Sequence, residues 1–219
     1  RTATIDHIKY ARLSEDYSQP ATGANLGLYS ITFTNNMDWD YHSLQAFADF
    51  RVEAERKNFR YFLEIFNPNV DPGIPDKKVG SFLNDHIVRA LAGVTSSSRP
   101  LFLKMPFNGP GPLEELVSYD PGLIVGILGG GAGTTLDAFQ LIHDAQRYGA
   151  RVALFGRKIN LSEHPLAFIE FLRRIVEGEI GPKEAVKAYH GVLQQLGIQP
   201  IRHLNRDLQI TETALGYAR

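Results

Sequence analysis

The stretch PLFLKMPF (residues 100–107) contains a lysine within an otherwise apolar segment, and our prediction of the fold depends mainly on it. Successive side chains of a β-strand face opposite sides of the sheet. One face of this strand is therefore aliphatic and suits packing against outer helices (Leu101, Leu103 and Met105). Phe102 and Lys104 face the other way, toward the interior of a closed sheet.

The preceding apolar stretch, RYFLEIF (60–66), shows the same alternation. Leu63 and Ile65 face outward, and three residues are left on the inner face: Phe62, Glu64 and Phe66. We therefore expect Glu64 and Lys104 at matching depths on neighbouring strands. A charge inside an apolar strand is either paired or functional, because an unpaired one is costly to bury.

Short β-rich runs alternate with amphipathic segments along the chain, which is typical of repeated strand–helix units. The predicted strands are 26–34, 60–66, 100–107, 122–129 and 151–156. The predicted helices are 42–58, 79–94, 111–119, 134–149, 166–178 and 181–197. This order predicts a single α/β domain over residues 1–219, a (β/α)8 TIM barrel whose first strands are missing from the sequence. The alternative is an open doubly wound parallel sheet.

Composition excludes several classes of protein. The formal net charge of −1 gives no electrostatic field for nucleic acid. No apolar run is long enough to span a bilayer, and the first residues are too charged for a secretory signal, so we expect no membrane partner and a cytoplasmic location. The absence of cysteine removes disulfides and thiolate chemistry. The seven histidines show no metal-binding spacing, so we expect neither a metal nor a cofactor.

Lys104 is the first candidate for catalysis. A lysine attacks carbonyl groups when desolvation frees its amine, and Phe102 and Met105 can supply an apolar setting. Glu64 can relay protons to the adduct that forms. The alternative is structural, with Glu64 only neutralising Lys104.

A glycine-rich loop is the second candidate. LGGGAGTTLDAF (128–139) leads from a strand into a helix, and FGRKIN (155–160) ends the next strand. Backbone amides at a helix start can bind an anion, and arginine grips phosphate through two bonds. In barrel enzymes the loops after the last two strands bind phosphate. The alternative is a tight turn beside a surface Arg157.

These segments together resemble class I (Schiff-base) aldolases of the bacterial type, a family that includes tagatose 1,6-bisphosphate aldolase. The resemblance covers about residues 24 to 217. Its carriers are FRVEAERKNFRYFLEIFNPN (50–69), LFLKMPFNG (101–109), GILGGGAGTTLDAFQLIHDAQRYGA (126–150), ALFGRKIN (153–160) and HLNRDLQITETA (203–214).

The resemblance implies a metal-independent lyase that binds a ketose phosphate. Lys104 is then the Schiff-base lysine and Glu64 the acid on the preceding strand. A phosphate cradle includes Gly130, Gly131, Gly156 and Arg157. Ser30, which stands where the family carries a second lysine, and Asn108 are further candidates for substrate contacts.

Two other functions stay open. One is a phosphate-binding barrel isomerase or epimerase without covalent catalysis. The other is a sugar-phosphate-binding relative without catalysis, which the serine at position 30 suggests. The tail helices carry apolar residues that look exposed and could either cover the floor of the barrel or form a homo-oligomer contact: Phe168, Phe171, Ile175 and Leu193.

Overall fold

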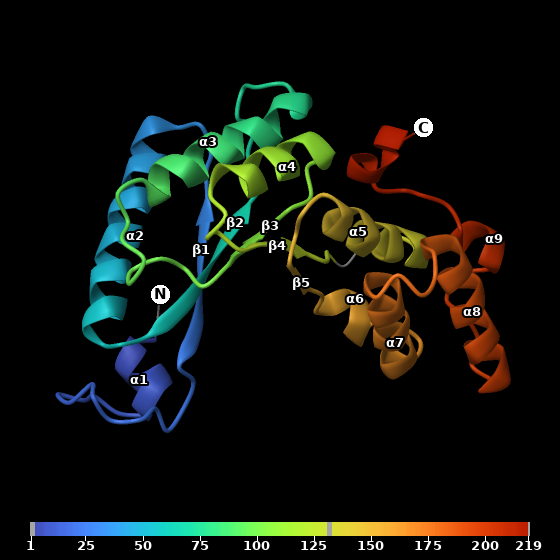
Figure 1. The fold of residues 1–219 in the computed structure, drawn as a ribbon, viewed down its shortest axis with the longest axis horizontal. Helices are drawn as coiled ribbons and strands as arrows, with labels where there is room; N and C mark the ends of the chain where they lie inside the picture. Colours follow the sequence, from blue (N-terminus) through green and yellow to red (C-terminus); the bar gives the residue numbers. More distant parts are fainter. Residues whose placement is uncertain (1–2, 131–132, 219) are drawn as a thin grey trace. The chain divides into compact units, whose positions relative to one another are not determined.

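The chain forms a five-stranded, all-parallel sheet whose strands alternate with helices, in the order β1-β2-β3-β4-β5. The computed structural model describes residues 3–130 and 133–218 (Figure 1). The strands are β1 (Leu26–Thr32), β2 (Arg60–Phe66), β3 (Leu103–Met105), β4 (Val125–Leu128) and β5 (Val152–Leu154). The α/β fold predicted from the sequence is confirmed at this level.

Helices precede, separate and follow the strands. They are α1 (Ile5–Tyr10), α2 (Met37–Arg56), α3 (Val79–Leu91), α4 (Pro110–Tyr119), α5 (Thr135–Arg147), α6 (Arg157–Asn160), α7 (Pro165–Val176), α8 (Pro182–Gln195) and α9 (Leu204–Asp207). Two 3₁₀ turns cover Asp76–Lys78 and Thr213–Ala218. Among the described residues, none of these helices is both long and apolar enough to cross a membrane.

Contacts within the chain fall into two compact units. The first unit contains Arg1–Met105 and Gly122–Ile124, and the second contains Pro106–Pro121 and Val125–Arg219. Each unit has its own core.

In the first unit, α2 covers one face of β1 and β2. Phe50 of α2 stacks on Tyr29 of β1, with ring centroids 4.4 Å apart, and meets the ring of Tyr61 edge-on at 5.0 Å. Leu63 and Ile65 are fully buried on the same face of β2. The outward direction predicted for these two aliphatic residues is therefore confirmed.

Helix α1 lies near the end of α2 (Figure 1), and a buried lysine connects the two. The Lys9 side chain is 1% exposed, and its Nζ donates to the carbonyl oxygens of Lys57 at 2.7 Å and Asn58 at 3.0 Å. A cation suits this position, because the last carbonyls of a helix carry partial negative charge. Lys57 in turn forms an ion pair with Asp6 of α1 at 2.7 Å.

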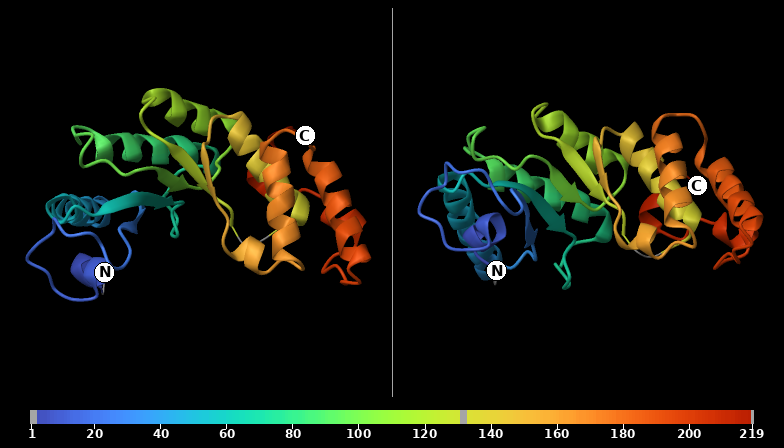
Figure 2. Two further views of the ribbon diagram at one scale, coloured as in Figure 1. Left: turned by 60° about the horizontal axis from the view of Figure 1, so that its bottom comes forward. Right: turned by 90° about the horizontal axis from the view of Figure 1, so that it is seen from below.

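In the second unit, α5, α7 and α8 lie side by side, as both views in Figure 2 show. Their core includes Phe139 of α5 and Tyr189 of α8, both fully buried. The four tail residues that look exposed in the sequence are buried in this core, with exposures of 0 to 5%: Phe168, Phe171, Ile175 and Leu193. The predicted exposure of these four residues is wrong, and they offer no surface for an oligomer contact.

Strand boundaries also differ from the prediction. β3 covers only Leu103–Met105, so Leu101 lies before the strand and is 43% exposed instead of packing under a helix. Leu103 and Met105 are buried as expected. Pro106, which lacks an amide hydrogen, directly follows the strand and ends it.

Candidate functional site

Three polar residues form a row across β1, β2 and β3. The strand register pairs Ser30 with Glu64, and Glu64 with Lys104. Lys104 Nζ lies 2.5 Å from Glu64 Oε1, and the Ser30 hydroxyl donates to Glu64 Oε2 at 2.9 Å. Each oxygen of one carboxylate thus has its own donor. The predicted adjacency of Glu64 and Lys104 is confirmed, whereas their catalytic role stays a prediction.

This row lies on the sheet face opposite the one that α2 covers. Glu64 is buried at 5% exposure, while the Lys104 side chain keeps 20% exposure and so can meet a ligand. Phe62 and Phe102 stack beside the ion pair, with centroids 4.7 Å apart and an interplanar angle of 16°. The Lys104 amine and the Glu64 carboxylate are close enough to exchange a proton. The stacked rings beside them provide an apolar surface on which a carbonyl compound can bind.

The Ser30 hydroxyl contacts the Glu64 carboxylate, and its contact with a substrate stays a prediction. This hydroxyl fixes the orientation of Glu64 and leaves Oε1 for Lys104. The sequence could not reveal this contact, because the two residues are 34 positions apart. The parity of β1 and β2 indicates only that both side chains share a face.

The glycine-rich loop belongs to the second unit. Gly130 has a positive φ of 61°. Gly131 lies outside the described residues. Gly156 caps the four-residue helix α6, and Arg157 is its exposed first residue. Asn108 is half-buried just before α4. Gly130, Asn108, Gly156 and Arg157 belong to the second unit, and their contacts with a ligand stay a prediction.

Two carboxylates already occupy the amides at the start of α5. The Thr134 amide donates to Asp137 Oδ2 at 2.7 Å, which completes the predicted capping box, and the Thr135 amide donates to Asp207 Oδ1 at 2.8 Å. An anion would therefore have to displace a carboxylate to use these amides. The helix start is a weaker phosphate site than the sequence indicated.

The buried Asp137 carboxylate accepts hydrogen bonds from more than one segment, whereas the sequence predicted only its role in capping α5. It also accepts the Thr211 hydroxyl at 2.5 Å and the amides of Thr211 and Glu212 at 2.8 and 3.1 Å. Burial alone would raise the pKa of this carboxyl, but the hydrogen bonds from Thr211, Thr134 and Glu212 outweigh it and hold the pKa below its usual value. Gly133 is required here, because φ is +80° and a Cβ would lie 2.5 Å from Asp137 Oδ2.

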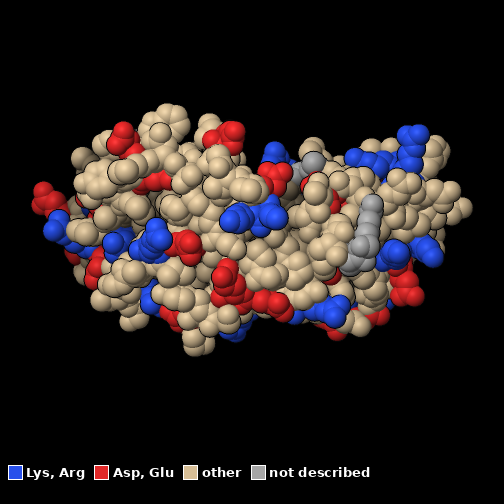
Figure 3. All heavy atoms as spheres, turned by 90° about the horizontal axis from the view of Figure 1, so that it is seen from above, with Lys and Arg blue, Asp and Glu red and all other residues tan. Residues whose placement is uncertain are grey.

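Histidines do not assemble a metal site. Within the described ranges no cluster of three or more histidine and acidic residues could hold a metal ion. His190 Nε2 instead lies 2.8 Å from Asp207 Oδ2. Positive and negative side chains are interspersed over the face shown in Figure 3, which agrees with the net charge of −1.

No protein-family model matches the chain, and no curated protein matches it.

Proposed function

We propose that the chain is part of a class I aldolase, a carbon–carbon lyase that forms a Schiff base between Lys104 and the ketone of a sugar phosphate. The observation that supports this proposal is the row of Ser30, Glu64 and Lys104 on a sheet face that α2 leaves uncovered. We further propose that the five parallel strands are part of a (β/α)8 barrel with this row on its inner face.

The first step is proton transfer within the ion pair. Lys104 gives a proton to Glu64, and the neutral amine adds to the ketone carbon. The Glu64 carboxyl then returns that proton to the hydroxyl of the adduct, which leaves as water and forms an iminium ion. Ser30 keeps the carboxylate in the required orientation throughout.

The carbon–carbon bond breaks in the second step. The Glu64 carboxylate removes the proton of the substrate hydroxyl β to the iminium carbon. The bond breaks, an aldehyde leaves, and the electron pair moves into the iminium to give an enamine. Protonation of the enamine and addition of water release the second product and restore the Lys104 amine.

Borohydride trapping tests the proposal. The protein is incubated with tagatose 1,6-bisphosphate, reduced, digested and analysed by mass spectrometry. We expect a reduced adduct on Lys104, none in Lys104→Met, and an unchanged adduct in Lys183→Met, whose lysine is exposed on α8. An unmodified Lys104 in folded protein at saturating ketose phosphate contradicts covalent catalysis.

A binding function without catalysis is the second candidate. The serine opposite Glu64 favours it, because Ser30 supplies no second amine for proton transfer. It predicts that calorimetry detects binding of the same bisphosphate while no aldehyde is released.

A further inference from the structure

The second unit contains a small cavity, and its described lining includes none of the catalytic or substrate-binding residues predicted from the sequence. Its volume is about 200 Å³, and its walls include Gly133, Thr135, Lys158, Ser162, Glu163 and Arg202. This volume far exceeds the roughly 10–15 Å³ that admits one water molecule, but it is below the roughly 300–1,000 Å³ of pockets for drug-sized ligands. The cavity therefore suits a small, hydrated or ionic ligand.

Two cations lie at this cavity. Lys158 is half-buried, and its Nζ donates to the carbonyl oxygen of Gly133 at 2.7 Å. Arg202 is exposed and forms no ion pair within the described part of the chain. Burial lowers the pKa of the Lys158 amine, and the nearby charge of Arg202 lowers it further; Asp207, Asp137 and Glu163 act in the opposite direction.

The three carboxylates near Lys158 are already bound to other donors. Each oxygen of Asp137 accepts at least two hydrogen bonds, from Thr134, Thr211 and Glu212. Asp207 accepts the Thr135 amide and contacts His190. Glu163 accepts the Ile201 amide at 2.8 Å and the Tyr189 hydroxyl at 3.1 Å. These hydrogen bonds hold the three acids in place within the fold.

We propose that this cavity binds a small oxyanion of phosphate or sulfate size between Lys158 and Arg202. The ammonium of Lys158 supplies a compact charge from the wall, and the planar guanidinium of Arg202 can grip two oxygens of the anion. The anion is either free or the phosphate end of a metabolite, since the two share this chemistry. The site is separate from Gly156 and Arg157, and it does not depend on a Schiff base at Lys104.

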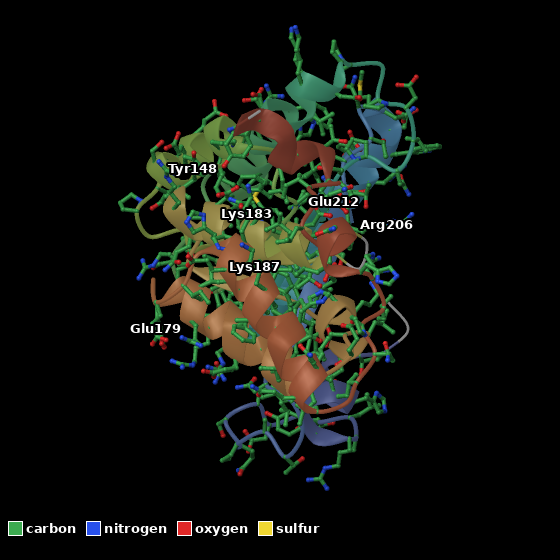
Figure 4. All side chains as sticks on the ribbon, turned by 90° about the vertical axis from the view of Figure 1, so that its right-hand side faces the viewer. Tyr148, Glu179, Lys183, Lys187, Arg206 and Glu212 are labelled. Carbon is green, nitrogen blue, oxygen red and sulfur yellow. The ribbon has the colours of Figure 1, made fainter. Side chains whose placement is uncertain are left out.

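Titration of the whole chain with inorganic phosphate, followed by calorimetry, tests the site. We expect saturable binding that Arg202→Gln and Lys158→Met each weaken at least tenfold. Arg206→Gln and Lys183→Met are the matched controls, because both side chains are exposed in the same unit (Figure 4), and they should stay within twofold. A parallel titration with glycerol 3-phosphate identifies a metabolite phosphate if that ligand binds more tightly.

Arg157→Gln separates this site from the predicted glycine-loop site. Unchanged binding in Arg157→Gln supports the cavity, whereas loss in Arg157→Gln with full binding in Arg202→Gln overturns it. The absence of saturable binding to the unmodified chain also overturns it. Because Arg202→Gln changes an exposed residue, its result does not depend on whether Lys158→Met folds. Lys104→Met should bind phosphate normally, so failure of the aldolase proposal leaves this result intact.

The pH dependence of binding gives a second readout. A bound anion favours the charged form of Lys158, so the affinity should fall as the pH rises through the pKa of this amine. Sulfate is the better probe, because phosphate itself titrates near neutral pH. The groups facing the amine are Arg202, Asp207, Asp137 and Glu163. An equally steep dependence in Lys158→Met contradicts the assignment.

Discussion

The ion pair between Lys104 and Glu64 makes an asymmetric prediction about stability. Lys104→Met leaves a carboxylate whose side chain is only 7% exposed and which keeps the hydrogen bond from the Ser30 hydroxyl. Removing one partner of a buried pair costs about 3–5 kcal/mol, and the serine reduces this to about 3 kcal/mol. Glu64→Gln leaves a lysine that is 20% exposed. Water reaches that amine, so we expect a loss of about 1–2 kcal/mol.

The double variant completes the test. With both charges gone, no buried ion remains, and we expect a loss of about 2 kcal/mol instead of the sum of about 4–5 kcal/mol. Urea unfolding is followed by circular dichroism and by the fluorescence of Trp39, the single tryptophan, which lies in α2 of the same unit. Lys77→Met, at an exposed lysine of that unit, is the control. Additivity of the two single effects within about 0.5 kcal/mol refutes the coupling.

Three further predictions concern hydrogen bonds to charged groups. Asp137→Asn should cost about 2–3 kcal/mol. Hydrogen bonds hold the folded pKa of this carboxyl below its usual value, so its contribution to stability is present above the usual pKa and is lost as the pH falls through the folded pKa. Urea melts of the variant at decreasing pH should lack that decline, and an identical decline in both proteins contradicts the prediction. Ser30→Ala should cost about 1–2 kcal/mol and slow the borohydride trapping of Lys104; an unchanged trapping rate rejects the positioning role. Lys9→Met should cost about 2 kcal/mol and speed amide hydrogen exchange in α1, and unaltered exchange there argues against the anchor.

Local patterns in the sequence predicted much of this structure. The two-residue alternation in RYFLEIF located Glu64 on the face opposite Leu63 and Ile65. The spacing of Thr134 and Asp137 predicted a capping box, because both partners lie within one helical turn. Such features depend only on residues a few positions apart, so the local sequence is enough to predict them.

Contacts between distant segments could not be predicted. An apolar helix face indicates burial but not the partner, so Phe168 and Ile175 looked free until α5 and α8 were seen to cover them. The bond from Thr135 to Asp207 joins residues 72 positions apart, and no pattern announces it. Lys158 went unnoticed beside Arg157 because the sequence does not reveal which of two adjacent cations turns toward the protein.

The hydrogen bonds between Thr211 and Asp137 have a consequence for the synthesis of the protein. Thr211 lies 74 residues after Asp137, so at about 5–20 residues per second the ribosome adds it roughly 4–15 s later. During that interval the first turn of α5 has its local cap but lacks three of the donors that later surround the carboxylate. Water must therefore solvate the Asp137 carboxylate until the segment with Thr211 and Glu212 has been synthesised.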